Sequence, residues 1–158
     1  MIEKDQSVPD IQLFRATQDG PAPVKTSELL DGKTTVLFAV PGAFTPTCSA
    51  KHLPGFVEKK DALKDKGVDQ VVCMSVNDAF VMQAWGESAD AGDIVMLADG
   101  NGEFAEKLGL TMDGEAYGMG KRSQRFAMIL DGTKVREVFV EEPGAFEVSS
   151  AEHVLANL

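Results

Sequence analysis

The stretch TTVLFAVPGAFTPTCSAKH (Thr34–His52) joins a strand to a helix through a short turn. Its first part, Thr34–Val40, is apolar, rich in β-branched residues and almost uninterrupted, as is typical of a strand covered on both faces. Pro, Gly, Thr and Pro residues follow, and Cys48, one of two cysteines, stands where the helix begins. The stretch therefore predicts an α/β protein with a thiol at the end of a strand.

Apolar runs and helical patterns alternate along the rest of the chain. Further strands are expected at Val71–Val76, Ile94–Asp99, Phe126–Leu130 and Lys134–Val140, and helices after Cys48, Asn77, Asn101 and Ser149. The last two strands are separated by a turn and predict a hairpin. Strands joined by helices predict a parallel core, to which the hairpin adds antiparallel strands. We expect a mixed central sheet flanked by helices on both faces, with a thioredoxin-like or flavodoxin-like arrangement.

Composition limits the class of protein. The chain has 158 residues, of which 44% are hydrophobic and 25% charged, so residues 1–158 are expected to form one domain. A net charge of −10 argues against nucleic acid or an anionic membrane as partner. The N-terminus is polar, and no apolar run reaches the roughly 18 residues of a membrane span. Two cysteines without a CxxC motif fit a reducing compartment, so a cytoplasmic protein without a metal site is expected.

The beginning of the first long helix gives Cys48 surroundings that favour an anion. Thr45 is expected to be the N-cap, with its hydroxyl accepting a backbone N–H, and Pro46 the first helical residue. Cys48 then lies in the first turn, where unpaired N–H groups and the helix dipole stabilise negative charge. This predicts a thiolate nucleophile. The alternative is a cysteine that only fills the core.

The pattern Pro41-x-x-x-Thr45-x-x-Cys48 resembles the active-site signature of peroxiredoxins. Four stretches are similar to the type II, or atypical, subfamily: PGAFTPTCSAKHLPGF, MSVNDAFVMQAW, LADGNGEFAEKLGL and KRSQRFAMILDGTKV. The resemblance extends from about Pro9 to Leu158. It implies a thioredoxin-like fold with an N-terminal extension and an inserted element. It also implies a thiol-dependent peroxidase of antioxidant defence that needs no metal, haem or flavin.

The resemblance assigns roles to four residues. Cys48 is expected to attack hydrogen peroxide, alkyl hydroperoxides and peroxynitrite and to become a sulfenic acid. Thr45 is expected to contact the thiolate and the peroxide, and Pro41 to shield the site from water. Arg125 is expected to stabilise the thiolate and the charge on the leaving oxygen. The alternative for Arg125 is a solvated surface arginine.

Cys73 is open to two interpretations. It lies within an expected strand among apolar residues, where a buried small side chain is the simple alternative. The resemblance implies that it is a resolving cysteine, which requires the segment around Cys48 to unwind because a disulfide needs Cα atoms within about 7 Å. Some subfamily members carry a further cysteine near the C-terminus, where this chain has FEVSSAEH (Phe146–His153). The implied reductant is thioredoxin if Cys73 resolves, and glutathione with glutaredoxin if it does not.

Other residues and functions stay open at this level. His52, four residues after Cys48, would suit a Cys/His hydrolase or a metal pair, but two ligands do not hold a metal, and a hydrogen-bonded or surface histidine is favoured. An apolar group is expected in the core or at a homodimer contact that the resemblance implies: Phe44, Phe80, Met82 and Trp85. A disulfide reductase or glutathione-dependent transferase is disfavoured by the missing CxxC. A non-enzymatic redox sensor that uses Cys48 is the remaining alternative.

Overall fold

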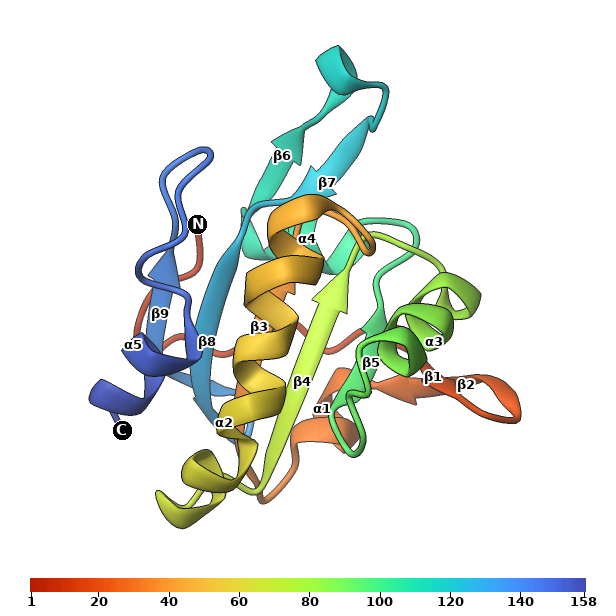
Figure 1. The fold of residues 1–158 in the computed structure, drawn as a ribbon. Coiled ribbons are helices and arrows are strands. Elements are labelled where there is room, and N and C mark those ends of the chain that lie inside the picture. The colour runs from red at the N-terminus through yellow and green to blue at the C-terminus, as the bar shows by residue number, and fades with distance from the viewer.

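The computed structural model describes residues 1–158 and is built around one seven-stranded sheet (Figure 1). Its strand order is β2-β1-β5-β4-β3-β8-β9. The strands of this sheet are β1 (Gln12–Thr17), β2 (Gly20–Lys25), β3 (Thr34–Val40), β4 (Gln70–Ser75), β5 (Val95–Ala98), β8 (Phe126–Asp131) and β9 (Lys134–Val140). Strands β3, β4 and β5 are parallel, while β1 and β8 run antiparallel to their neighbours. The mixed sheet and the β8–β9 hairpin are therefore confirmed.

Helices cover both faces of this sheet. They are α1 (Thr26–Leu30), a π-helix η1 (Cys48–His52), α2 (Leu53–Asp65), α3 (Ala79–Ser88), α4 (Glu103–Leu108), a 3-10 helix η2 (Glu115–Tyr117) and α5 (Ala151–Ala156). Buried side chains of α2, α3 and α5 pack on one face, and those of α1 and α4 on the other. Figure 1 shows α2 running along the first of these faces. No helix has the length and hydropathy that a membrane span requires.

The central strand β3 contributes to both cores because its side chains alternate between the faces. Val36, Phe38 and Val40 belong to the core under α2, α3 and α5. Leu37 and Ala39 belong to the core on the opposite face. This alternation explains the uninterrupted apolar run in the sequence, since a strand that is covered on both faces has no polar side.

Antiparallel additions at the N-terminus and after α4 distinguish the fold from a purely parallel sheet. The hairpin of β1 and β2 joins the edge of β5 through the pairs Phe14–Ala98 and Arg15–Leu97. A second sheet is formed by β6 (Thr111–Asp113) and β7 (Lys121–Ser123), which project beyond the main sheet in Figure 1. These two hairpins correspond to the expected extension and insertion. The arrangement is thioredoxin-like, and the flavodoxin-like alternative does not apply.

The helix starts differ from the sequence prediction by one or more residues. The carboxylate of Asp78, not Asn77, caps α3 by accepting the N–H of Val81 at 2.9 Å. At α4 the N-cap is Gly102 in place of Asn101. The orphan N–H groups there are satisfied from outside the helix by Asp99, as tertiary contacts can override local capping signals.

Asp99 is fully buried, and each of its carboxylate oxygens accepts one N–H from the first turn of α4, from Phe104 at 3.0 Å and Ala105 at 2.9 Å. Asp99→Ala leaves both donors buried without partners, so we expect it to lower the free energy of unfolding by about 1–3 kcal/mol. Urea unfolding checks this, with Asp61→Ala on the exposed side of α2 as control. Equal losses in the two variants would contradict the capping role.

Candidate active site

The loop that follows β3 is held in place by Asn77 at the end of the neighbouring strand β4. The Asn77 side-chain oxygen accepts the backbone N–H of Ala43 at 2.9 Å and the hydroxyl of Ser75 at 2.6 Å. Phe44 within this loop has a φ of 64°, which a bulky residue adopts only when its surroundings impose it. Asn77 therefore ties the loop to β4, while the neighbouring Asp78 caps α3.

Thr45 does not cap the helix in the predicted way. Its hydroxyl donates to the carbonyl of Gly42 at 2.7 Å, and its own carbonyl accepts the N–H of Ser49 at 2.9 Å. The expectation that its hydroxyl accepts an orphan N–H is wrong, because the tight turn brings the Gly42 carbonyl within its reach. Pro41 is half-buried directly after β3, and Gly42 is buried beside it.

Cys48 lies in the first turn as expected, but that turn continues as a π-helix rather than an α-helix. The π-helix spans Cys48–His52, and the N–H of Leu53 donates to the Cys48 carbonyl. Pro54 explains the wider turn, because it has no N–H for the carbonyl of Ala50 and its ring would crowd that carbonyl in a regular α-helix. Such single π turns are frequent at functional sites.

The Cys48 thiol, Arg125 and His52 are joined by hydrogen bonds of one guanidinium group. Arg125 Nη2 donates to Cys48 Sγ at 3.1 Å, and Arg125 Nη1 lies 2.8 Å from His52 Nδ1. Cys48 and His52 are fully buried, while Arg125 is half-buried. The register of β8 against β3 pairs Phe126 with Ala39, and this places Arg125 beside the end of β3 where the loop begins. Arg125 is therefore no solvated surface arginine.

His52 acts as a neutral acceptor toward Arg125. A guanidinium only donates, so His52 Nδ1 carries no proton. Nε2 lies 2.9 Å from the Ser149 carbonyl and therefore donates to it. Burial, with the positive charge of Arg125 as a second cause, lowers the pKa of His52 from 6.5 to about 3. The favoured interpretation of His52 as a hydrogen-bonded histidine agrees with this geometry, while its contact with Arg125 was not anticipated.

A loop near the C-terminus completes the surroundings of this group. The ring of Phe146 lies 5.0 Å from the His52 ring, edge on, and 5.9 Å from Arg125 Cζ. Ser149 is fully buried, and its hydroxyl donates to Glu141 at 2.7 Å. The sequence assigned none of these three residues to the site, because they lie far from Cys48 in the chain. Ser149 was expected only to begin the last helix, whose N-cap is Ser150.

Cys73 is fully buried in the central strand β4, where it pairs in register with Phe38 and Met96. It belongs to the same core as Cys48, and neither cysteine forms a disulfide. Burial raises the pKa of Cys73 well above its ordinary value, and the nearby Cys48 adds to this. Cys73 is thus a protonated core thiol in this state.

The expected apolar group separates into two pairs. Met82 and Trp85 are core residues of α3, and the Trp85 indole donates to Ser49 at 3.0 Å. Phe44 and Phe80 are instead exposed, by 54% and 71%.

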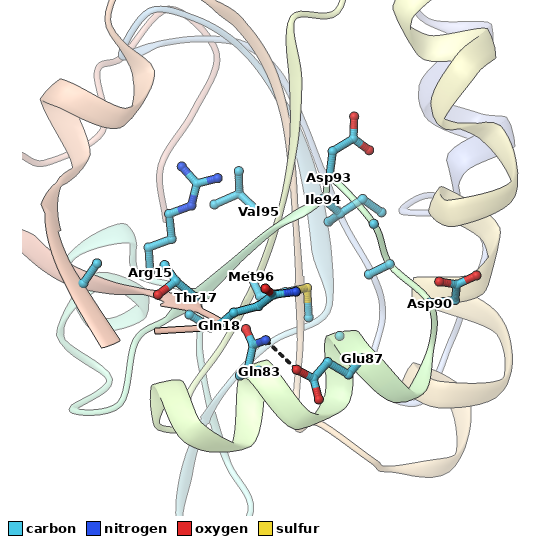
Figure 2. A pocket seen from close by; sticks show the side chains of 15 residues that line it. Arg15, Thr17, Gln18, Gln83, Glu87, Asp90, Asp93, Ile94, Val95 and Met96 are labelled. Atoms are coloured by element: carbon cyan, nitrogen blue, oxygen red, sulfur yellow. Dashed lines mark hydrogen bonds between the residues drawn. The ribbon is translucent and has the colours of Figure 1, made fainter. Parts of the chain in front are cut away.

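A cavity of about 710 Å³ lies away from Cys48, between β1, α3 and β5. Figure 2 shows Arg15 on one side of it and the hydrogen-bonded pair Gln83 and Glu87 on α3. Neither Cys48 nor Arg125 lines this cavity. The structure gathers no group of three or more His, Cys, Asp or Glu side chains that could hold a metal ion.

The buried neutral His52 makes stability depend on pH. Between pH 6.5 and about 3 the unfolded chain binds a proton at His52 that the folded chain does not, so stability falls as the pH falls through this range. At pH 5 this residue alone is expected to cost about 2 kcal/mol relative to pH 7.5. Urea unfolding at both pH values checks this, and His52→Gln should lose correspondingly less. The same loss in both proteins would show that His52 is not buried in its neutral form.

Comparison with known proteins identifies the family of this chain. The family model described as Redoxin matches residues 3–155. Peroxiredoxin-2B of Arabidopsis thaliana is 53% identical over 131 residues, covering 82% of this chain and 81% of that protein. Peroxiredoxin-2C of Oryza sativa subsp. japonica is 46% identical over 154 residues, covering 96% and 95%. Reduced Prx3 from Vibrio vulnificus, solved in complex with hydrogen peroxide, superposes with a TM-score of 0.96 at 52% identity over 99% of both chains. The chain therefore belongs to the redoxin family and, within it, to the type II peroxiredoxins, which are thiol-dependent peroxidases.

Proposed function

We propose that Cys48 is the peroxidatic cysteine and that it reduces hydrogen peroxide, alkyl hydroperoxides and peroxynitrite. The observation that carries this proposal is the hydrogen bond from Arg125 Nη2 to Cys48 Sγ. A fixed cation against the sulfur stabilises the thiolate, which is the reactive form of cysteine. The position of Cys48 in the first helical turn acts in the same direction.

The chemical step needs no oxidant or reductant besides the thiolate and the peroxide. The Cys48 sulfur forms a bond to one peroxide oxygen, the O–O bond breaks, and the electron pair stays on the leaving oxygen. With hydrogen peroxide or an alkyl hydroperoxide, that oxygen takes up a proton from solvent and departs as water or alcohol; with peroxynitrous acid, nitrite departs. A sulfenic acid is left on Cys48. Arg125 is the group that stabilises the negative charge as it moves from sulfur to oxygen.

Thr45 and Pro41 have supporting roles in this proposal. Because the Thr45 hydroxyl gives its hydrogen to Gly42, its oxygen has lone pairs that can accept the O–H of a hydroperoxide. Pro41 adds an apolar, half-buried ring at the start of the loop that limits the access of water.

Cys73 is the resolving cysteine of this proposal. The Cys73 sulfur attacks the sulfur of the Cys48 sulfenic acid. The displaced hydroxyl group takes the thiol proton and leaves as water, and the resulting Cys48–Cys73 disulfide is reduced by thioredoxin. Since both cysteines are fully buried, the π-helix around Cys48 has to unwind and β4 has to open locally before the bond forms. Glutathione with glutaredoxin is the reductant if Cys73 takes no part.

A single oxidation experiment tests both cysteines. Reduced protein is mixed with one equivalent of hydrogen peroxide, quenched within a second, alkylated and weighed by intact mass. The wild type should lose both thiols, Cys73→Ser should give a trapped sulfenic acid, and Cys48→Ser should not react faster than free cysteine. One oxidised thiol in both the wild type and Cys73→Ser would remove the resolving role. Slow oxidation of the wild type would contradict the peroxidatic role of Cys48 and favour a redox sensor.

The protein is further proposed to be a cytoplasmic homodimer whose residues 1–158 form one domain. Two exposed phenylalanines support the dimer, since large apolar side chains at the surface favour an interface. Phe80 is 71% exposed on α3 and lines a shallow cavity of about 270 Å³ with Phe14 and Pro21, and Phe44 is 54% exposed in the active-site loop. One domain is supported by the packing of both cores against the same sheet.

Sedimentation of the reduced protein at micromolar concentration checks the dimer. The wild type should sediment as a dimer, and Phe80→Ser should shift it toward the monomer because it removes the largest apolar contact area of this surface. Tyr117→Ser is the control, since Tyr117 is 84% exposed in η2, between β6 and β7, and does not line that cavity. A wild type that is only monomeric would exclude the dimer.

A further inference from the structure

The Glu141 carboxylate ties together the loop of residues 141–149 through hydrogen bonds. Glu141 Oε2 accepts three hydrogen bonds from that loop: the N–H of Glu147 at 2.7 Å, the N–H of Ser149 at 2.9 Å and the hydroxyl of Ser149 at 2.7 Å. Glu141 is buried, with 7% of its surface exposed. Burial opposes its ionisation, but the hydrogen bonds from Ser149 and the loop N–H groups outweigh this and lower its pKa. The loop is therefore fastened by an ionised side chain.

The loop of residues 141–149 contacts both His52 and Arg125. The Ser149 carbonyl accepts His52 Nε2–H at 2.9 Å, and the Phe146 ring packs on His52 and Arg125. The N–H of Glu141 also donates to the backbone carbonyl of Arg125 at 3.0 Å. Glu141 is thus joined to Arg125 directly through the backbone and indirectly through Ser149 and His52.

We propose that Glu141 is a positioning residue for the reaction of Cys48, because it closes the loop that orients His52 and, through His52, the guanidinium of Arg125. This inference rests on the proposed role of Cys48. Its structural basis is a continuous hydrogen-bonded chain from Glu141 to Ser149, His52, Arg125 and Cys48 Sγ.

The chain orients Arg125 without neutralising its charge. None of the ion pairs in the structure joins Glu141 to Arg125, and Glu141 Oε2 is occupied by donors of the loop. The group that does touch Arg125 Nη1 is the neutral His52 ring. A carboxylate in its place would compete with the thiolate for the guanidinium. The negative charge of Glu141 is instead held by the loop and does not touch the guanidinium of Arg125. That guanidinium therefore remains available to the Cys48 sulfur and to the leaving oxygen.

Glu141→Gln tests this, with Glu142→Gln as matched control, because Glu142 is the exposed neighbour in the same loop. Two readouts are measured on the full chain: the second-order rate constant for hydrogen peroxide and the pH midpoint of Cys48 alkylation by iodoacetamide in a Cys73→Ser background. We expect Glu141→Gln to lower the rate constant about tenfold, as small misplacements of a catalytic group do, and to raise the alkylation midpoint. Glu142→Gln should change neither.

A double-mutant cycle with His52→Phe separates positioning from general loss of structure. The phenylalanine keeps the ring packing of His52 against Phe38, Phe56 and Phe146 but breaks the hydrogen-bonded chain. If Glu141 acts through His52, Glu141→Gln should lower the rate less than about twofold further in that background. If the double variant loses rate by the full product of the two single losses, Glu141 does not act through His52 and the proposal is overturned.

The remaining outcomes are also decisive. A Glu141→Gln variant with the wild-type rate and wild-type alkylation midpoint would overturn the positioning role while leaving the peroxidatic role of Cys48 intact. A wild type that reacts slowly with peroxide would instead contradict the proposed function, and the alkylation midpoint would still report on Glu141. If Glu141→Gln does not fold, Ser149→Ala removes one of the three bonds and should shift both readouts in the same direction by less.

Discussion

The structure around Cys48 depends on one guanidinium group that has two different acceptors. Arg125 reaches the Cys48 sulfur with Nη2 and a neutral histidine nitrogen with Nη1. The first acceptor gains stability when it is negatively charged, and the second orients the cation without reducing its charge. A cation at a half-buried position is costly unless its donors are satisfied. The surrounding elements meet that requirement: the π-helix supplies Cys48 and His52, and the C-terminal loop supplies Phe146 and Ser149.

Burial has opposite consequences for the polar groups on this side of the sheet. It keeps His52 neutral and Cys73 protonated, while the fully buried Cys48 keeps a cationic donor at its sulfur. Glu141 is buried and still favours its ionised form because three donors converge on one of its oxygens. Glu141 differs from His52 and Cys73 in two ways: several donors converge on its charged form, and it lies closer to the surface, with 7% of its surface exposed while theirs is fully buried. No buried side-chain nitrogen or oxygen lacks a partner, so the polar network is complete.

The proposed resolving role of Cys73 requires motion, because Cys73 is buried in the middle of the sheet. Cys73 sits in a strand with neighbours on both sides, and each of those pairs is part of the continuous sheet. The segment around Cys48 is different, because a π turn followed by a proline has fewer regular backbone hydrogen bonds than an α-helix. The hydrogen bonds of Arg125, His52 and Trp85 hold this segment in the folded form. Opening is therefore expected to start at the π-helix rather than at β4.

The sequence by itself determined the features that depend on neighbouring residues. Apolar runs marked β3, β4, β5 and β8 to within a residue or two, the turn before Lys134 marked the hairpin, and the motif ending at Cys48 marked the strand-to-helix junction. These signals are local because side-chain periodicity and turn chemistry act over a few residues. Resemblance to peroxiredoxins added Arg125 to the expected site, which no spacing rule would have selected.

Tertiary structure alone decided which distant side chains meet. Arg125 lies beside Cys48 because the antiparallel register of β8 on β3 pairs Phe126 with Ala39. The Thr45 hydroxyl donates to the Gly42 carbonyl, and the Asn77 side chain accepts the N–H of Ala43 in the active-site loop, two contacts that the sequence did not predict. No local pattern placed Glu141 or Ser149 near Cys48, and they lie beside Arg125 and His52 because β9 returns the chain to the end of β8. Contacts of this kind depend on strand register and loop closure, which local sequence patterns do not encode.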